Sequence, residues 1–402
     1  MASNRLPAVL GGTPAADKVI EIVRPAFPDL NDFVADFREA LTTGQVTNGG
    51  RHVEAFEDAL SAFLGAPAIC FNNGQAALMA LLRSAGVDRG SVIVPAYTFS
   101  GTAHAVTWCG AEPLFADSLP DARYVIDPDD VARKIRPDTR AILAVDIHGL
   151  IAPHDALADV ADRHGIPLIL DSAQAFGSSI SENLVSRAAL GQVFSFHATK
   201  SLTTMEGGCL VSDDPDVIQR AKSIRNFGQG VTADCVEAGF NGKMTEICGL
   251  IGTHQLPLFP AMADERKAIG RHYAASLAGI SGINLPEAET DTEPVWFNYP
   301  LSIDAGLFGL DRDELAYCLD LENVKVRKYF EVPCHKLSAY KDNTPAGLVN
   351  AERMAASVIA LPVFTPMSEQ DRQAVTDAIV SIADNAGAIR GKLGQGRSAT
   401  GS

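Results

Sequence analysis

Two side chains in this sequence have the types and positions that pyridoxal phosphate (PLP) chemistry requires. Asp171 ends the apolar run Leu168-Ile169-Leu170, and Lys200 follows 29 residues later, just after the alternating apolar stretch Gln192–Phe196. A lysine amine can form a Schiff base with the aldehyde of PLP, and a carboxylate can hold the pyridine nitrogen protonated so that the ring accepts electrons. The pair therefore predicts a PLP site with Lys200 as its catalytic residue.

Each of these two residues also has a simpler interpretation. Asp171 would be a helix N-cap, a common use of aspartate, and Lys200 would be a surface lysine. The apolar neighbours Phe194, Phe196 and Leu202 weaken the surface interpretation of Lys200. A carboxylate at the end of a buried strand is costly unless it is paired, and a pyridinium N–H would pair it.

Further candidates accompany this pair. Gln174, three residues after Asp171, is placed to donate a hydrogen bond to the phenolic oxygen of the ring. Ser195 and His197 face the same side of a strand because side chains alternate along it, and Ser195 is a candidate phosphate contact. His197 is interpreted as a core histidine rather than as a ligand.

An anion-binding turn is predicted at Asn72-Asn73-Gly74-Gln75. Gly74 lets the backbone approach a ligand, and the free amides of a helix that begins near Gln75 favour a phosphate. An ordinary strand-to-helix turn is the alternative. Phe99, which ends the segment Pro95-Ala96-Tyr97-Thr98-Phe99, is a candidate to stack on the ring, although a core aromatic is the simpler interpretation.

These candidates follow short apolar runs that alternate with helical patterns. Strands are predicted over Ala68–Phe71, Ser91–Pro95, Ala141–Ile147, Pro167–Leu170, Gln192–Phe196 and Cys209–Ser212. Helices are predicted over Gln75–Ala85, Gly101–Cys109, Pro153–His164 and Pro215–Arg225. This alternation predicts an α/β fold with a mostly parallel sheet flanked by helices. Because ligands of such sheets bind at the carboxyl ends of the strands, we expect one crevice to collect the candidate residues.

The pattern changes in the second half of the chain and suggests two domains. We expect an N-terminal arm over residues 1–30, a large PLP-binding domain over 31–245 and a smaller C-terminal α+β domain over 246–388. Residues 389–402 are rich in Gly and Ser and are predicted to be a disordered tail.

The composition excludes several classes of function. The formal charge of −16 argues against nucleic-acid binding, and the absence of an apolar run of about 18 residues argues against a membrane span. The seven cysteines are scattered and form no C-x-x-C pair, so neither a disulfide framework nor a zinc site is expected. Reduced thiols fit a cytoplasmic location.

Several ordered motifs resemble those of the PLP-dependent sugar aminotransferases of the DegT/StrS type, which have PLP fold type I. Ser195–Lys200, followed by Glu206-Gly207-Gly208, is similar to the family's lysine motif. Asp171–Gln174, Pro95–Phe99 and Asn73–Leu78 are similar to its carboxylate, aromatic and phosphate-turn motifs, although Gln75 stands where Thr is common. The resemblance covers roughly residues 8 to 385.

The resemblance continues toward the C-terminus and implies further site residues. Gly239–Glu246 is similar to a segment whose Asn, here Asn241, reaches the phosphate site of a neighbouring subunit, which implies a homodimer with shared active sites. Val326–Phe330, followed by His335 and Tyr340, resembles the family's C-terminal motif. The substrate-binding residues implied in this way are Lys243, Arg327, Tyr329 and His335.

The resemblance implies an aminotransferase that moves an amino group from L-glutamate to a nucleotide-linked keto sugar in amino-sugar biosynthesis. Leu10–Pro14, Val46–Gly50 and Lys243 are most similar to enzymes that aminate C4 of dTDP-4-keto-6-deoxyglucose. A cyclitol (scyllo-inosose type) aminotransferase and a non-catalytic PLP-fold regulator remain open. Lys200 argues against a dehydratase of the same fold, because those relatives carry His at this position. Separately, the segment Ser178–Ala189 departs from the family's usual Gly-rich hairpin.

A diphosphate substrate would need a local positive site, because the chain as a whole is acidic. The candidate cations are Arg225, Lys243, Arg327 and Lys328. Arginine suits phosphate geometry best, and for Lys328 a solvated surface charge is an equally good interpretation.

Overall fold

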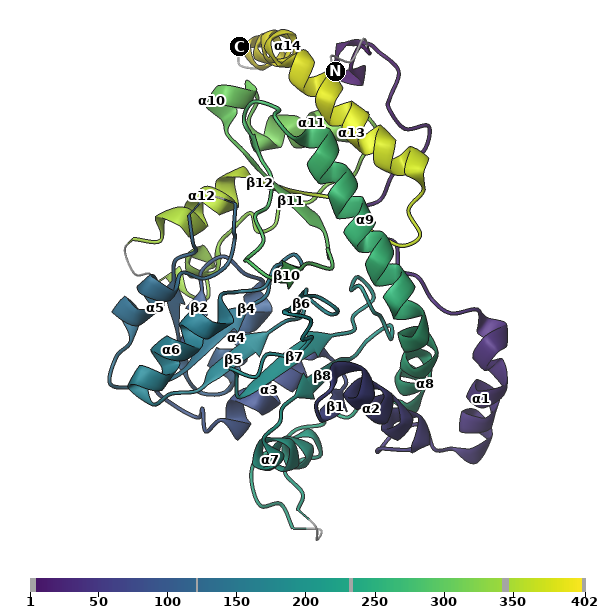
Figure 1. Ribbon diagram of the computed structural model, residues 1–402, viewed down its shortest axis with the longest axis vertical. Helices are drawn as coiled ribbons and strands as arrows, with labels where there is room; N and C mark the ends of the chain where they lie inside the picture. Colours follow the sequence, from purple (N-terminus) through teal and green to yellow (C-terminus); the bar gives the residue numbers. More distant parts are fainter. Residues whose placement is uncertain (1–4, 121, 231–233, 342–346, 400–402) are drawn as a thin grey trace.

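A seven-stranded, mainly parallel sheet forms the centre of the protein, as seen in a computed structural model that describes residues 5–120, 122–230, 234–341 and 347–399 (Figure 1). The strand order is β1-β8-β7-β5-β4-β2-β3, and β8 runs antiparallel to the other six strands. The strands are β1 Ala68–Phe71, β2 Ser91–Pro95, β3 Glu112–Ala116, β4 Thr139–Val145, β5 Leu168–Asp171, β7 Gly191–Ser195 and β8 Gly208–Val211. The predicted α/β class is confirmed, and each predicted strand lies within two residues of an observed one.

Helices cover both faces of this sheet, so its strands are buried on both sides. The helices of this part are α2 Arg51–Leu64, α3 Gly74–Ser84, α4 Ser100–Trp108, α5 Pro128–Lys134, α6 His154–His164 and α7 Pro215–Arg225. Along β7, Val193 packs in the same hydrophobic cluster as α3, whereas Phe194 packs in the cluster that contains Phe56 and Leu60 of α2. This alternation explains why the strands read as continuous apolar runs in the sequence.

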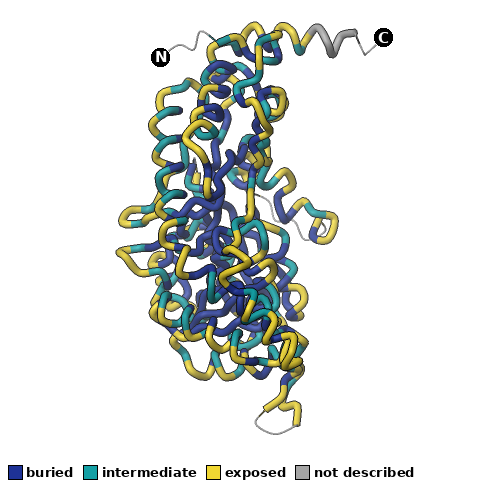
Figure 2. The backbone as a smooth tube through the Cα atoms, turned by 90° about the vertical axis from the view of Figure 1, so that its right-hand side faces the viewer, coloured by how far each residue is buried: buried dark blue, intermediate teal, exposed yellow. Residues whose placement is uncertain are grey.

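A second, smaller sheet and its helices lie in the upper half of Figure 1. Its antiparallel strands are β9 Ile283–Asn284, β11 Tyr299–Ile303 and β12 Val358–Leu361. The surrounding helices are α10 Ala305–Phe308, α11 Arg312–Leu321, α12 Val349–Ser357 and α13 Glu369–Asp384. The long helix α9, Phe259–Leu277, runs between the two halves, and Figure 2 shows buried chain continuing from one half into the other.

Helix α8 Glu246–Gln255 packs on α2, and helix α1 Leu30–Thr43 packs on α8, at the lower right of Figure 1. Glu246 fixes this corner, because its buried carboxylate accepts hydrogen bonds from the N–H groups of Gly50 and His52 at 2.7 and 2.9 Å.

The predicted domain boundaries at residues 30, 245 and 388 stay predictions. Short 3-10 helices among the described residues include η1 Ala8–Leu10, η2 Leu256–Leu258 and η3 Cys334–Lys336.

A buried carboxylate helps to hold the described part of the N-terminal arm on the C-terminal half. Glu322 follows α11 and accepts hydrogen bonds from the backbone N–H groups of Ala8 and Ala15, both at 2.7 Å. The guanidinium of Arg5 also binds this carboxylate. The arm is therefore held by its backbone as well as by its charge.

The prediction of a disordered tail from residue 389 is wrong for the described residues. The chain continues as helix α14, Ala386–Ala399, and Ile389 is fully buried against the core. Leu393, one helical turn later, packs on the same cluster. Two apolar side chains four residues apart give the Gly-rich segment one face to bury, which composition alone did not reveal.

The unusual segment Ser178–Ala189 is tied to the chain that precedes β11. Its strand β6, Ser179–Ile180, pairs antiparallel with β10, Thr292–Glu293. The Ser178 hydroxyl donates to the carbonyl of Gly149 at 2.8 Å and accepts from the N–H of Val295 at 2.9 Å.

In the part of the chain that the structure describes, no helix is long and apolar enough to cross a bilayer.

Candidate active site

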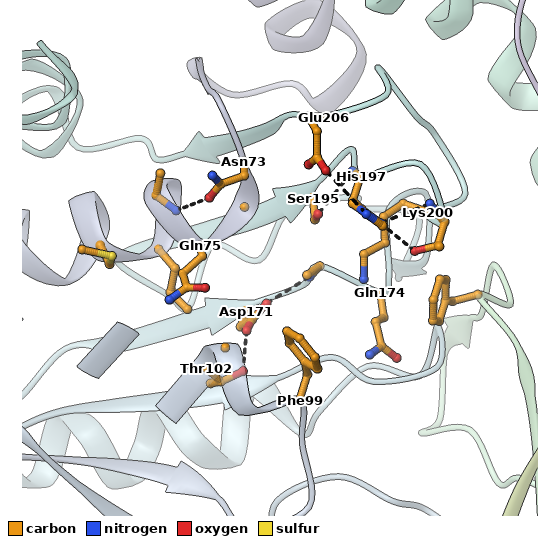
Figure 3. A pocket seen from close by; sticks show the side chains of 18 of the residues that line it. Asn73, Gln75, Phe99, Thr102, Asp171, Gln174, Ser195, His197, Lys200 and Glu206 are labelled. Carbon is orange, nitrogen blue, oxygen red and sulfur yellow. Dashed lines mark hydrogen bonds and ion pairs between the residues drawn. The ribbon is translucent and has the colours of Figure 1, made fainter. Parts of the chain in front are cut away.

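A cavity of about 820 Å³ opens at the carboxyl ends of β1, β2, β5 and β7. Nine of the twelve predicted site residues line it: Gly74, Gln75, Phe99, Asp171, Gln174, Ser195, Lys200, Arg327 and Tyr329. Figure 3 shows that Lys200, Asp171 and Phe99 reach this space from three different elements. The parallel sheet therefore does collect these side chains at one edge, as expected from the topology.

Lys200 lies on the loop after β7 and points into the cavity. Its ammonium nitrogen lies 4.6 Å from the centroid of the Phe297 ring, and its backbone N–H donates to the carbonyl of His197 at 2.9 Å. Burial lowers the pKa of Lys200 to about 8, although the charge of Asp171 works in the opposite direction. A lysine in this state is partly neutral near physiological pH and is a competent nucleophile and base.

Asp171 ends β5 with its carboxylate directed toward the cavity. Its Oδ2 accepts a hydrogen bond from the Thr102 hydroxyl at 2.7 Å, and its Oδ1 accepts the N–H of Ala173 at 3.2 Å. Burial raises its pKa, which these two hydrogen bonds partly offset. No helix follows Asp171, so the N-cap interpretation is wrong; the carboxylate keeps acceptor capacity for a further donor.

The start of α3 forms a cradle of backbone amides beside Ser195. The Asn73 side chain caps this helix by accepting the N–H of Ala76 at 2.8 Å, while the first N–H groups of a helix have no partner within it. A Cβ at Gly208 would lie 2.5 Å from the Gly74 nitrogen, and a Cβ at Gly74 would lie 2.9 Å from the Cβ of Ser195. Glycine at both positions thus keeps the amide face open to an anion.

Phe99 and Gln174 complete the wall around Lys200. Phe99 is 61% exposed, so it is not the core aromatic of the simpler interpretation, and its ring faces the cavity (Figure 3). The carbonyl oxygen of the Gln174 side chain accepts the N–H of His148 at 2.9 Å. This contact fixes the amide plane and leaves the NH2 group of Gln174 as a donor.

Residues 29–380 match the DegT/DnrJ/EryC1/StrS aminotransferase family. The chain belongs to this family. The dTDP-4-amino-4,6-dideoxy-D-glucose transaminase of Escherichia coli is 31% identical over 365 residues, which cover 88% of this chain and 96% of that protein. The dTDP-3-amino-3,4,6-trideoxy-alpha-D-glucose transaminase of Streptomyces venezuelae is 31% identical over 371 residues, or 89% and 96% of the two chains.

The solved structures agree with this assignment. A crystal structure of DesI in the presence of its TDP-sugar product superposes with a TM-score of 0.90 at 32% identity, over 96% of this chain and 98% of that chain. The fold is PLP fold type I, and the protein is a PLP-dependent aminotransferase.

The donors and acceptors of this aminotransferase suit PLP. The amides at the start of α3 and the Ser195 hydroxyl suit a phosphate, and the Asp171 carboxylate suits a protonated ring nitrogen. The exposed ring of Phe99 offers an aromatic face between them. These groups lie in one cavity together with the amine of Lys200.

Arg327 is the one candidate cation, of the four named in the sequence, that lines the cavity. Among the described residues no carboxylate pairs with its guanidinium. Arg225 instead pairs with Glu57 at 2.5 Å beneath β1, and Lys328 pairs with Asp313 at 2.8 Å. Arg225 and Lys328 are therefore committed to the protein's own carboxylates, whereas Arg327 is available to an anionic ligand.

Three predicted site residues do not line the cavity. Asn241 is exposed, and the ammonium of Lys243 lies 4.4 Å from the ring centroid of Phe227. His335 is fully buried and pairs with Glu352 at 3.2 Å, so the structure does not bring it to the substrate side. Burial also lowers its pKa. The sequence motif located His335 near the cavity but gave no information on which way its ring points.

Several lining residues were missed or misinterpreted from the sequence. Thr102, which binds Asp171, follows a run of small residues at the start of α4 and gave only the weak signal of a polar residue near a strand end. Phe297 packs against Lys200 from a segment far along the chain. His197 is exposed at the cavity mouth, not buried in the core as expected, because β7 ends at Ser195.

Proposed function

We propose that this aminotransferase transfers an amino group from L-glutamate to a nucleotide-linked keto sugar. The observation that carries the proposal is the match, along nearly nine-tenths of the chain, to two transaminases whose names specify dTDP-linked amino sugars. Arg327 supports it, because its guanidinium lines the same cavity as Lys200 without a carboxylate partner among the described residues, and a nucleotide diphosphate brings negative charge to this cavity.

For the acceptor we propose the C4 ketone of dTDP-4-keto-6-deoxyglucose. The motifs Leu10–Pro14 and Val46–Gly50 motivate this choice from the sequence, together with Lys243. The two relatives differ in the carbon that carries their amino group, 4 in one name and 3 in the other, so the family match by itself does not select C4.

Within the cavity we assign roles by geometry and residue chemistry. Bound PLP supplies an aldehyde that takes up the amino group and a ring that accepts electrons. Lys200 holds the cofactor and, once released, moves protons as general acid and base, for which a pKa of about 8 is suitable. Asp171 holds the proton of the ring nitrogen, and Gln174 donates to the phenolic oxygen.

The remaining roles concern binding. Gly74, Gln75 and Ser195 bind the phosphate, and Phe99 stacks on the ring. Arg327 binds an anionic part of the substrate, and Tyr329 lines the sugar side of the cavity. Asn241 and Lys243 do not line the cavity of their own chain, which supports a homodimer in which each chain completes the neighbour's site.

Mass spectrometry of products tests this function most directly. The purified protein with PLP is incubated with 15N-labelled glutamate and a panel of ketones: dTDP-4-keto-6-deoxyglucose, its 3-keto isomer, UDP- and GDP-linked keto sugars, and free scyllo-inosose. We expect the label in the dTDP-4-amino sugar, and none with the Lys200→Ala variant as control.

Other outcomes of this experiment separate the alternatives. Label in the 3-amino isomer or in another nucleotide sugar corrects the acceptor but keeps the class of reaction. Label in the free cyclitol alone replaces the proposal with a cyclitol aminotransferase. A yellow protein whose visible absorbance does not respond to any amino donor would instead be a PLP-binding regulator.

A further inference from the structure

A buried hydrogen-bond network lies behind Asp171, on the side away from the cavity. Its members are Asp146, His154, Ser172 and Gln192, which come from four different segments of the large sheet and its helices. All four are buried, and none of them lines the cavity. Buried polar groups are costly unless each one is paired, so the contacts of this network define what it holds in place.

Asp146 is the centre of the network. Its Oδ1 accepts the N–H of Ala152 and contacts Nε2 of His154, both at 2.9 Å. Its Oδ2 accepts the hydroxyl of Ser172 at 2.5 Å, and Ser172 in turn accepts the side-chain N–H of Gln192 at 2.8 Å. Both carboxylate oxygens of Asp146 are thus engaged, one of them by the residue next to Asp171.

The network holds the backbone on both sides of Asp171. The N–H of Asp146 donates to the carbonyl of Asp171 at 3.0 Å. The N–H of Ser172 donates to the carbonyl of Val193 at 2.8 Å, and the next N–H, from Ala173, donates to the Asp171 carboxylate. The orientation of that carboxylate therefore depends on where Ser172 is held, and Asp146 holds its side chain.

We propose that Asp146 is a positioning residue that acts through Ser172 to orient the Asp171 carboxylate toward the cofactor ring. A carboxylate held in place before the ligand arrives loses less freedom when it binds the ring N–H. The negative charge of Asp146 adds to burial in raising the pKa of Asp171, which strengthens its hold on a shared proton. The inference rests on the role proposed above for Asp171.

Two conservative variants test this link. Ser172→Ala removes the hydroxyl that donates to the Asp146 carboxylate, and Asp146→Asn keeps the shape but removes the charge. The readouts are the dissociation constant of PLP from the apoprotein, the 15N chemical shift of the ring nitrogen in bound 15N-labelled PLP, and the melting temperature. Asp130→Asn is the matched control, since Asp130 is another buried aspartate with hydrogen bonds to Asp117 and Lys134, outside the cavity.

We expect each variant to weaken PLP binding about threefold to tenfold, the range of one net hydrogen bond, and to shift the 15N signal toward unprotonated pyridine. The double variant should bind PLP no more weakly than Asp146→Asn alone, because both changes interrupt the same path from Asp146 through Ser172 to Asp171. The Asp130→Asn control should lower the melting temperature and leave PLP binding unchanged.

Three results would overturn the inference. The first is normal PLP affinity and a normal 15N shift in Ser172→Ala, which decides the question even if Asp146→Asn fails to fold. The second is additive losses in the double variant, and the third is an equal loss of affinity in Asp130→Asn. Asp171→Asn serves as the reference. If the ring nitrogen stays protonated in this variant, the proposed role of Asp171 fails. If ring protonation is lost in Asp171→Asn but not in Ser172→Ala or Asp146→Asn, only the positioning role of Asp146 is rejected.

Discussion

The cavity around Lys200 and the outer edge formed by Asn226, Phe227, Asn241 and Lys243 contrast in how their side chains are held. In the cavity, Asp171 is 8% exposed and hydrogen-bonded from two elements. At the outer edge, Phe227 is 49% exposed, and Lys243 rests on its ring and donates to the side chain of Asn226 at 3.2 Å.

This difference separates what one chain can build from what requires a second chain. The cavity groups are fixed by the sheet, so a single chain orients them before any ligand binds. Of the outer-edge groups, Phe227 and Asn241 are exposed and Asn226 and Lys243 are half-buried, and none of the four lines the cavity of its own chain. The family resemblance associates Asn241 with the phosphate site of a neighbouring subunit. We therefore expect changes in the cavity to affect the chemistry and changes at the outer edge to affect cofactor retention through a neighbour.

The largest effect is expected from Lys200→Ala, which removes the only amine proposed to hold the cofactor. Turnover should fall by about 10²- to 10⁴-fold from the lost acid–base function alone, with the fold intact by circular dichroism. Borohydride reduction of the unmodified protein should attach the cofactor to the peptide that contains Lys200. The control variant Lys222→Ala, at an exposed lysine, should give the same adduct and the same turnover as the unmodified protein. An adduct on another lysine would contradict the assignment.

Asp171→Asn should have the next largest effect. The amide still fits between Thr102 and Ala173 but cannot balance the charge of a protonated ring, so we expect a fall in kcat on the order of 10²-fold with PLP still bound. Steady-state kinetics at saturating glutamate measures this loss. Near-normal turnover would mean that the carboxylate has only a structural role at the end of β5.

Arg327→Gln should act on substrate binding rather than on the chemistry. Because no carboxylate of the described residues pairs with its guanidinium in the cavity, we expect the KM for the sugar nucleotide to rise about tenfold or more, with the glutamate half-reaction spared. The adjacent Lys328→Gln is the control, since Lys328 already pairs with Asp313. Equal KM changes in the two variants would show that only overall charge matters.

Asn241→Ala tests whether the outer edge serves a second chain. Loss of a hydrogen bond to a phosphate should weaken PLP binding by about tenfold or more. Mixing Asn241→Ala with Lys200→Ala subunits should restore activity, because both lesions collect in one site of the mixed dimer and leave the other site complete. A fully active monomer by light scattering, or no recovery after mixing, would reject shared sites.

The smallest effect concerns the pH dependence of cofactor attachment. Burial lowers the pKa of Lys200 to about 8, so its amine becomes neutral as the pH rises through that value. The rate of PLP attachment to the apoprotein should rise about tenfold from pH 7 to pH 9 and then level off, whereas the rate for Nα-acetyl-lysine should keep rising with pH. A rate that still rises in proportion to hydroxide at pH 10 would place the pKa near its ordinary value.

Most strands were predictable because burial on both faces gives continuous apolar runs with turn residues after them. The strand β3 was missed: it lies at the edge of the sheet and contains Pro113, which edge strands tolerate and which weakens a strand pattern in the sequence. Helix α14 was missed because Ile389 and Leu393 are isolated apolar residues whose burial depends on neighbours far away in the chain.

For the site, sequence order was enough to find residues that follow strand ends, since parallel strands bring those ends together. Sequence order could not show which of the candidate cations lines the cavity, because that depends on their tertiary partners. Arg225 forms an ion pair with Glu57, and Lys328 forms one with Asp313. Nor could sequence order reveal that His335 turns into the core, where Glu352 contacts it. A 3-10 helix of three residues is too short to give a periodicity from which the direction of this side chain could be predicted.

The buried carboxylate of Glu322 has a practical consequence for anyone who wishes to shorten or tag the protein. Its three donors come from Arg5, Ala8 and Ala15, which lie more than 300 residues earlier in the chain. Removing the first fifteen residues would leave the buried Glu322 carboxylate without these donors. We expect this to destabilise the C-terminal half without removing any residue that lines the cavity. An affinity tag belongs ahead of this arm, with the arm itself left intact.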